Sequence, residues 1–117
     1  KPSERPMHDA DEAVCFQVIE HVRDEELFIE NLRILNRKVR IGTINKDVWP
    51  FVEGVEVFTG RRNPYHVNEY DLTAFKALAR YFTDYTFFSQ TYDAGQYWMV
   101  EGLYSNALNF YIHGVLL

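Results

Sequence analysis

The amino-acid sequence lacks several features that would place a protein in a specialised class. Its 117 residues include a single cysteine, Cys15, so an intrachain disulfide bond is excluded. No apolar run reaches the roughly 18 to 20 residues that a membrane-spanning helix needs, and the polar start is no secretory signal. Acidic residues outnumber basic ones, and the formal net charge of -5 argues against a broad nucleic-acid-binding surface. We therefore expect a cytoplasmic protein with no membrane partner.

Glycine and proline are also scarce. There are 6 glycines and 4 prolines, and no Gly-x-Gly pattern of the kind that cradles a nucleotide phosphate occurs. Hydrophobic residues make up 47% of the chain and aromatic residues 16%, which suffices for one domain with a modest core. Residues 1–12 form a polar leader. Because the chain begins with Lys1 rather than methionine, we expect it to be part of a longer protein.

The first half of the chain predicts a strand, a helix and a second strand. Residues 13–18 are an apolar run with one polar member, which is typical of a strand covered on both faces. Asp24 is a good N-cap for a helix that ends near Asn36, and residues 39–44 form the next β-rich run. Residues 13–44 therefore predict a βαβ unit, whose crossover is almost always right-handed.

A long connection and a second helix follow. Residues 45–70 contain scattered glycines and prolines, and a connection of this length is usually a lid or a substrate loop. Asp71 then caps a predicted second helix. Its apolar stripe consists of Leu72, Phe75, Leu78, Ala79 and Phe82.

The end of the chain is rich in β-forming residues. Residues 85–92 and 97–103 are two such runs, and the turn-forming linker between them favours an antiparallel hairpin. Residues 71–103 therefore predict a helix followed by a hairpin. The apolar tail, residues 104–117, fits either a helix or an edge strand.

Three side chains follow the first predicted strand closely enough to form a site. If the chain turns helically after Phe16, Gln17, Glu20 and His21 lie at i, i+3 and i+4 and share one face. This face lies at the carboxyl end of the strand, where open α/β sheets bind ligands. A carboxylate and an imidazole there can hold a divalent cation or act as a general acid and base pair. The alternative is that Glu20 and His21 only stabilise a tight turn through hydrogen bonds.

A second histidine is placed to reach the same cleft. Residues 63–70 read Asn-Pro-Tyr-His-Val-Asn-Glu-Tyr and lie between the second strand and the second helix, over the carboxyl edge of the sheet. His66 is thus a candidate partner of Glu20 and His21, and a metal-dependent hydrolytic site is one hypothesis for the three. The alternative is that Pro64 sets a turn and His66 is an exposed loop residue.

These stretches together resemble a known family. The A-V-C-F-Q-V-I-E-H-V sequence of residues 13–22, the strand at residues 39–44 and the N-P-Y-H-V-x-E-Y loop match, in order, class I S-adenosylmethionine-dependent methyltransferases. The resemblance implies a Rossmann-like α/β sheet and transfer of a methyl group from S-adenosylmethionine. It also implies that the chain is the carboxyl-terminal half of such a domain, without the first three strands and the glycine-rich turn. One wall of the cofactor pocket would be formed by Phe16, Gln17 and Val18.

The resemblance also implies a metal site. In the branches that methylate the 3′ end of small RNAs or act in ubiquinone synthesis, the turn after this strand carries metal ligands. The matching residues here are Glu20, His21 and His66, and Gln17 stands where those branches have a carboxylate. Because Mg²⁺ prefers charged oxygen ligands, this change predicts weaker binding of the metal. His21 and His66 are also the implied catalytic residues.

We expect the methyl acceptor in the longer protein to be a small molecule or a glycan rather than RNA. Without the other half of the sheet, the fragment is expected to be inactive or nearly so. The strand at residues 13–18 would also be a bare edge that is open to pairing, so we predict a homo-oligomer formed through it. The alternative function is a non-catalytic, methyltransferase-derived module that dimerises or binds a partner.

Overall fold

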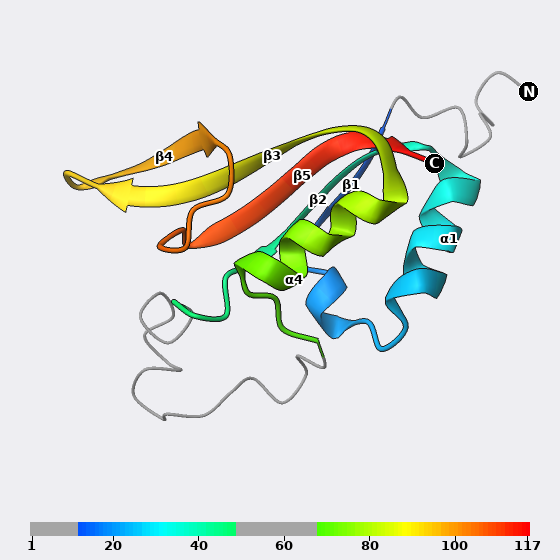
Figure 1. Cartoon of the computed structure of the whole chain (residues 1–117), viewed down its shortest axis with the longest axis horizontal. Helices are drawn as coiled ribbons and strands as arrows, with labels where there is room; N and C mark the ends of the chain where they lie inside the picture. The colour runs from blue at the N-terminus through cyan, green and yellow to red at the C-terminus, as the bar shows by residue number, and fades with distance from the viewer. Residues whose placement is uncertain (1–11, 49–67) are drawn as a thin grey trace, which may run out of the picture.

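The computed structural model describes residues 12–48 and 68–117. These residues form one five-stranded mixed sheet in the order β1-β2-β5-β3-β4, with helices packed on one of its faces (Figure 1). The strands are β1 (Ala13–Phe16), β2 (Lys38–Ile44), β3 (Phe82–Asp93), β4 (Gln96–Glu101) and β5 (Asn109–Leu116). The helices are the 3-10 helix η2 (Ile19–His21), α1 (Glu25–Leu35), α4 (Leu72–Lys76) and the 3-10 helix η3 (Ala77–Tyr81).

The predicted strand–helix–strand unit is confirmed as β1, α1 and β2. The two strands are parallel, with Phe16 opposite Gly42, and α1 connects them. Asp24 caps α1 as predicted, because its Oδ1 accepts a hydrogen bond from the Leu27 N–H at 3.0 Å. The helix closes at Asn36, whose N–H donates to the last turn.

The second predicted helix is shorter than its apolar stripe. Asp71 caps it, because its Oδ1 accepts a hydrogen bond from the Ala74 N–H at 2.8 Å, but α4 ends at Lys76 and a 3-10 turn follows. Phe82, predicted at the end of the stripe, instead begins β3 opposite Leu116. Phe82 is 5% exposed there, so the sheet buries this apolar side chain as well as a helix would.

The predicted hairpin is confirmed, whereas the tail differs from both predicted alternatives. β3 and β4 are antiparallel, with Asp93 opposite Gln96 at the turn. The tail forms β5, which lies inside the sheet between β2 and β3 and is antiparallel to both. Its alternate residues Phe110 and Ile112 are fully buried. An interior place in the sheet depends on partners far away in the sequence, and local residue patterns carry little information about such pairing.

The core lies between the sheet and the helices, and no helix among the described residues packs on the opposite face of the sheet. Ile29 of α1 and Phe75 of α4 pack in one cluster with the buried residues of β2 and β5. On the other face, Val14 and Phe16 of β1 are 55% and 45% exposed. The prediction that β1 is covered on both faces is therefore wrong for the described residues, because no helix among them packs on that side.

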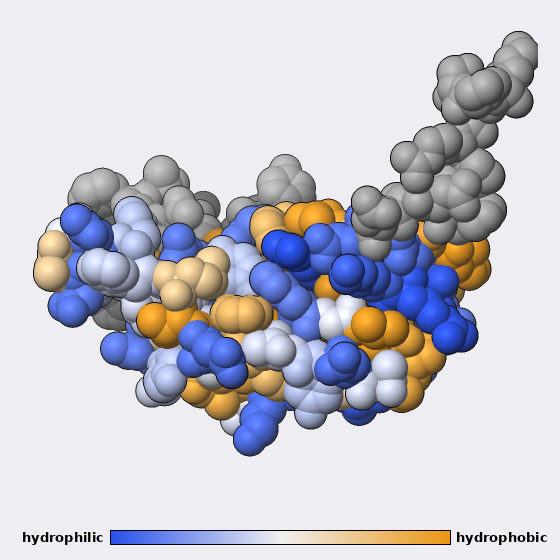
Figure 2. Space-filling model, turned by 90° about the horizontal axis from the view of Figure 1, so that it is seen from above, coloured by the Kyte–Doolittle hydropathy of each residue, from blue (hydrophilic) through white to orange (hydrophobic). Residues whose placement is uncertain are grey.

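Apolar and polar side chains are intermixed over the molecule when it is seen from above (Figure 2). No helix within residues 12–48 or 68–117 is long and apolar enough to cross a membrane.

Candidate functional site

The site begins at the carboxyl end of β1, where the chain leaves the sheet through Gln17. Gln17 has a φ of 61°, the left-handed conformation that only a small share of non-glycine residues adopt. Its N–H donates to the Gly42 carbonyl at 2.9 Å, and its side-chain Nε2 donates to Asn109 Oδ1 at 3.1 Å. These two bonds tie the turn to β2 and to β5. Strained turns of this kind cluster at binding sites.

The left-handed residue breaks the helical continuity that the sequence predicted after Phe16. Gln17 lies outside the 3-10 turn that contains Glu20 and His21. The Gln17 side chain is hydrogen-bonded to Asn109 of β5, whereas the Glu20 side chain is hydrogen-bonded to Thr43 of β2. Thr43 lies opposite Phe110, the residue after Asn109, so Thr43 and Phe110 share one face of the sheet. Successive residues of a strand point to opposite faces of the sheet. Gln17 and Glu20 therefore contact opposite faces and do not form one ligand set.

Glu20 and His21 lie next to each other with very different exposure. The Glu20 residue is 2% exposed, and its Oε1 accepts a hydrogen bond from the Thr43 hydroxyl at 2.7 Å. Its backbone carbonyl accepts from the Asn68 N–H at 3.1 Å. The His21 side chain is 41% exposed, with its Nε2 3.9 Å from Glu20 Oε2. This arrangement joins a buried carboxylate to an accessible imidazole, which can exchange a proton with a bound molecule.

The predicted partner His66 lies outside the described residues, as do the rest of 49–67. Within the described parts of the chain, no group of three His, Cys, Asp or Glu side chains is placed to hold a metal ion. A metal site or a catalytic pair that includes His66 therefore stays a prediction.

Phe16, Gln17 and Val18 are all exposed at the carboxyl end of β1, and their role as a pocket wall stays a prediction. Phe16 makes an edge-on contact with Tyr111, at 5.2 Å between ring centroids and 77° between planes. The Tyr111 ring lies against Gly42, where any Cβ would collide with it. Burial raises the pKa of the Tyr111 phenol.

Three residues of this site were missed by the sequence interpretation: Thr43, Asn109 and Tyr111. Thr43 is a polar residue between Ile41 and Ile44 near the end of a strand, and this placement was an available signal for a residue beside the ligand edge. Asn109 and Tyr111 belong to β5, and no local signal would have placed that tail beside Gln17.

The segment that leads into α4, residues 68–70, is held in place by a carboxylate. Glu25, in the first turn of α1, accepts hydrogen bonds from Tyr70 at 2.7 Å and Tyr81 at 2.8 Å, and it also binds Arg80. Burial, followed by the bond to Glu25, raises the pKa of Tyr81 to about 12. Asn68 Nδ2 donates to the Val22 carbonyl close by. Residues 68–70 therefore lie beside η2 and α1, next to the turn that carries His21.

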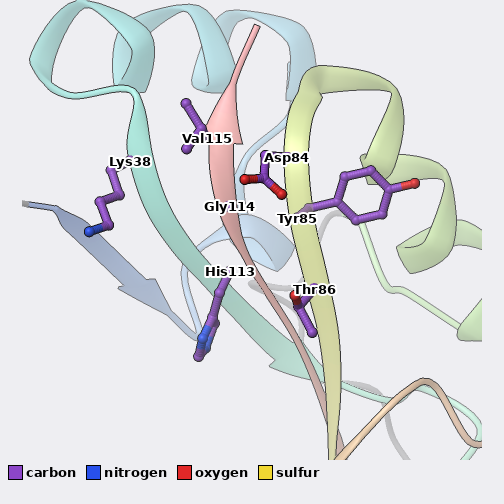
Figure 3. A pocket seen from close by; sticks show the side chains of 7 residues that line it. All are labelled: Lys38, Asp84, Tyr85, Thr86, His113, Gly114 and Val115. Atoms are coloured by element: carbon purple, nitrogen blue, oxygen red, sulfur yellow. The ribbon is translucent and has the colours of Figure 1, made fainter.

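A second hollow lies at the other end of β2 (Figure 3). It has a volume of about 210 Å³ and is lined by Lys38, Asp84, Tyr85, Thr86, His113, Gly114 and Val115. Lys38 lies at the start of β2, whereas Phe16 pairs with Gly42 near the end of β2. This pocket is therefore separate from the surface formed by Phe16, Gln17 and Val18. His113 packs on Phe88 with 4.7 Å between ring centroids. Burial, and then the charge of Arg40, lower the pKa of His113, while Glu12 acts in the opposite direction.

No protein-family model matches the chain, and no curated protein matches it. Among solved structures, the fold is similar to a SAM-dependent methyltransferase from Thermotoga maritima, described as a possible histamine N-methyltransferase. The two chains share 18% sequence identity with a TM-score of 0.65, over 90% of this chain and 55% of the other. This chain thus spans about half the length of that methyltransferase. The described structure therefore has a methyltransferase-like mixed α/β fold.

Proposed function

We propose that this chain is the carboxyl-terminal part of an S-adenosylmethionine-dependent methyltransferase and contributes one wall of its cofactor pocket. The observation that carries the proposal is the parallel pair β1–β2 in a methyltransferase-like sheet, with exposed Phe16, Gln17 and Val18 at the carboxyl end of β1. Open α/β sheets bind their ligands at this edge. The exposed apolar side chains fit a flat nucleoside, and the turn backbone is fixed by the bonds of Gln17.

S-adenosylmethionine supplies an activated methyl group when it is bound. The protein's part is to bind the acceptor, exclude water and take up the proton that the acceptor loses. The His21 imidazole is accessible and lies at this end of the sheet, so we assign it the role of general base. Glu20 supports the histidine from a buried position.

The acceptor that we propose is a small molecule or a glycan rather than RNA. The chain's net charge of -5 supports this choice, since RNA binding usually requires a basic surface. The Thermotoga maritima protein is described as a possible histamine N-methyltransferase, and histamine is a small-molecule amine. We do not assign Mg²⁺ to the turn, because the burial of Glu20 and its bond with Thr43 favour a structural role for this carboxylate.

Binding of S-adenosylhomocysteine to the full chain tests the cofactor wall. We expect chemical-shift changes in a ¹H–¹⁵N NMR titration at residues 16–18, with a dissociation constant near 1 mM, which corresponds to about 4 kcal/mol. Phe16→Ala should weaken this binding several-fold. Val14→Ala is the matched control, because Val14 is also exposed on the same face of β1 but lies away from its carboxyl end. Equal loss in both variants, or changes spread away from residues 16–18, would contradict the proposal.

A second candidate function is self-association, supported by the unpaired outer edge of β1. β1 pairs only with β2 within the described sheet, so its other edge presents free backbone groups. Exposed Val14 and Phe16 lie beside that edge, and such an edge readily pairs with another chain. A homo-oligomer through residues 13–18, or a non-catalytic dimerisation module, follows from this feature.

Sedimentation velocity over a range of concentrations tests the candidate. We expect a concentration-dependent dimer that Val14→Lys shifts to monomer, because a charge on the edge strand opposes pairing. Thr83→Lys, on an exposed residue of β3, is the control and should leave the dimer intact. A monomer at every concentration would exclude this function.

A further inference from the structure

The β3–β4 hairpin and the loop that follows it carry several exposed aromatic rings. Tyr92, Tyr97, Trp98 and Tyr104 are 53%, 65%, 48% and 48% exposed. Tyr92 and Tyr97 stack on each other across the two strands, with 4.9 Å between centroids. Tyr and Trp present large rigid surfaces that bind ligands well, and exposed apolar clusters of this kind mark interaction sites.

A pocket opens beside these rings. It has a volume of about 370 Å³, within the range of small-molecule sites. Its lining combines aromatic, aliphatic and polar side chains from β3, β4 and the loop that follows: Thr91, Tyr92, Asp93, Val100, Tyr104 and Asn106. No lysine, arginine or histidine is among them.

The loop side of the pocket is rigidly built around Ser89. Its fully buried hydroxyl donates to the Gly102 carbonyl at 2.8 Å and accepts from the Tyr104 N–H at 3.1 Å. Gly102 has a φ of 103°, and the Tyr104 ring lies over its Cα. The Ala107 N–H then closes a turn on the Tyr104 carbonyl at 3.0 Å. The backbone of Tyr104 is therefore fixed before any ligand arrives, with its ring against Gly102, which lowers the entropic cost of binding.

The polar lining residues remain available to a ligand. Within the described residues, the side chains of Thr91, Asp93 and Asn106 make no hydrogen bond or ion pair. Together they offer a hydroxyl, a carboxylate and an amide, which can donate to and accept from neighbouring hydroxyl groups. With no cationic group in the lining, the pocket does not suit a phosphate or another anion.

We propose that this pocket binds a neutral pyranose sugar. The apolar C–H face of the ring would stack on Tyr104, and its hydroxyls would pair with Asp93 and Asn106. A pyranose presents one apolar face and a rim of hydroxyl groups. The pocket offers an aromatic ring for the apolar face and the carboxylate and amide groups for the hydroxyls. The sugar site depends only on these pocket residues.

The pocket lies at the same end of the sheet as the cofactor wall. Asn45, just after β2, donates its side-chain amide to the carbonyls of Ser105 at 3.0 Å and Ala107 at 2.9 Å, so it ties the pocket loop to the carboxyl end of β2. A glycan held here would be presented at the edge where methyl transfer is proposed. This role as an acceptor site rests on the proposed function, whereas sugar binding does not.

An NMR titration of the full chain with methyl β-glucopyranoside and methyl β-N-acetylglucosaminide tests the sugar site. Saturable shifts are expected for at least one of the two, at the amides of Thr91, Asp93, Tyr104 and Asn106, and none with the open-chain polyol sorbitol. Tyr104→Ala should weaken binding about tenfold, and Asn106→Ala, on an exposed turn, should weaken it without affecting the fold. Tyr85→Ala is the control, since Tyr85 is similarly exposed at the other end of β3.

Three results would overturn the sugar site: no shift with either pyranoside, equal shifts with sorbitol, or equal loss in Tyr85→Ala. Concentration-dependent shifts at these amides without sugar would assign the surface to a second copy instead. S-adenosylhomocysteine is titrated separately, and its binding is followed by the chemical shifts of residues 16–18. Failure of the cofactor wall and failure of the sugar site are therefore distinguishable.

Discussion

The Thr43 hydroxyl donates a hydrogen bond of 2.7 Å to the Glu20 carboxylate, and this bond joins the turn after β1 to the neighbouring strand. The two residues are 1% and 2% exposed. A buried carboxylate is costly unless it is hydrogen-bonded, so this pair fixes the position of η2. His21 is the last residue of this turn, so the same bond positions it at the edge of the sheet.

Replacing Thr43 by valine should therefore destabilise the fold. The substitution keeps the shape of the side chain but removes a donor to a buried charge, and we expect the free energy of unfolding to fall by about 1–3 kcal/mol. Urea denaturation followed by circular dichroism measures this loss. Thr86→Val, at an exposed position of β3, is the control. Equal stability of the two variants would mean that the Glu20 carboxylate does not depend on Thr43.

The left-handed conformation of Gln17 predicts a specific ranking of substitutions. Gln17→Gly removes the side-chain bond to Asn109 but relaxes the backbone at φ 61°, so its effect on stability should be small. Gln17→Val should be less stable than Gln17→Gly by about 1–2 kcal/mol, because a β-branched residue is strained in this region. Urea midpoints of the two variants test the ranking. If valine were tolerated as well as glycine, the turn would not hold this conformation in solution.

Local features of the fold were predictable where the signal lies in adjacent residues. Both helix caps, Asp24 and Asp71, and the hairpin turn are encoded by short-range chemistry, and each is present in the structure. The interior position of β5 was not predictable, because it depends on pairing with β2 and β3 across most of the chain. The true length of the second helix was missed for the same reason, since the pairing of Phe82 with Leu116 ends the helical segment.

The candidate site was predictable in part. The sequence placed Gln17, Glu20 and His21 just after the first strand, and in the structure they follow β1 at the edge where the parallel strands β1 and β2 end. These residues would share one face only if a continuous helix ran from Gln17 to His21. The left-handed backbone of Gln17 interrupts that helix. Only the fold reveals that Thr43 and Asn109 bind Glu20 and Gln17 from opposite sides of the sheet.

Gly42 should tolerate no side chain while Tyr111 is present. A Cβ at position 42 would collide with the Tyr111 ring and come within 3.0 Å of Phe16, so Gly42→Ala should cost about 1–3 kcal/mol of stability. In the Tyr111→Ala background, the same substitution should cost much less, since the colliding ring is gone. A double-mutant cycle measured by urea denaturation gives this coupling. Strictly additive effects would show that Gly42 and Tyr111 do not interact.

Lowering the pH should destabilise the fold partly through His113. Burial and the Arg40 charge lower its pKa below the ordinary value of 6.5, so the unfolded chain takes up this proton more readily than the folded one. Neutral His113 therefore contributes fully to the free energy of unfolding above pH 6.5, and this contribution is lost as the pH falls below that value. His113→Gln removes this titration, and its stability should change less between pH 7.5 and pH 5.5 than that of the wild type. The titration of the His113 ring, followed by NMR, should give a midpoint below that of an unfolded histidine. A midpoint above 6.5 would mean instead that the Glu12 carboxylate controls this imidazole, and the sign of the pH dependence would reverse.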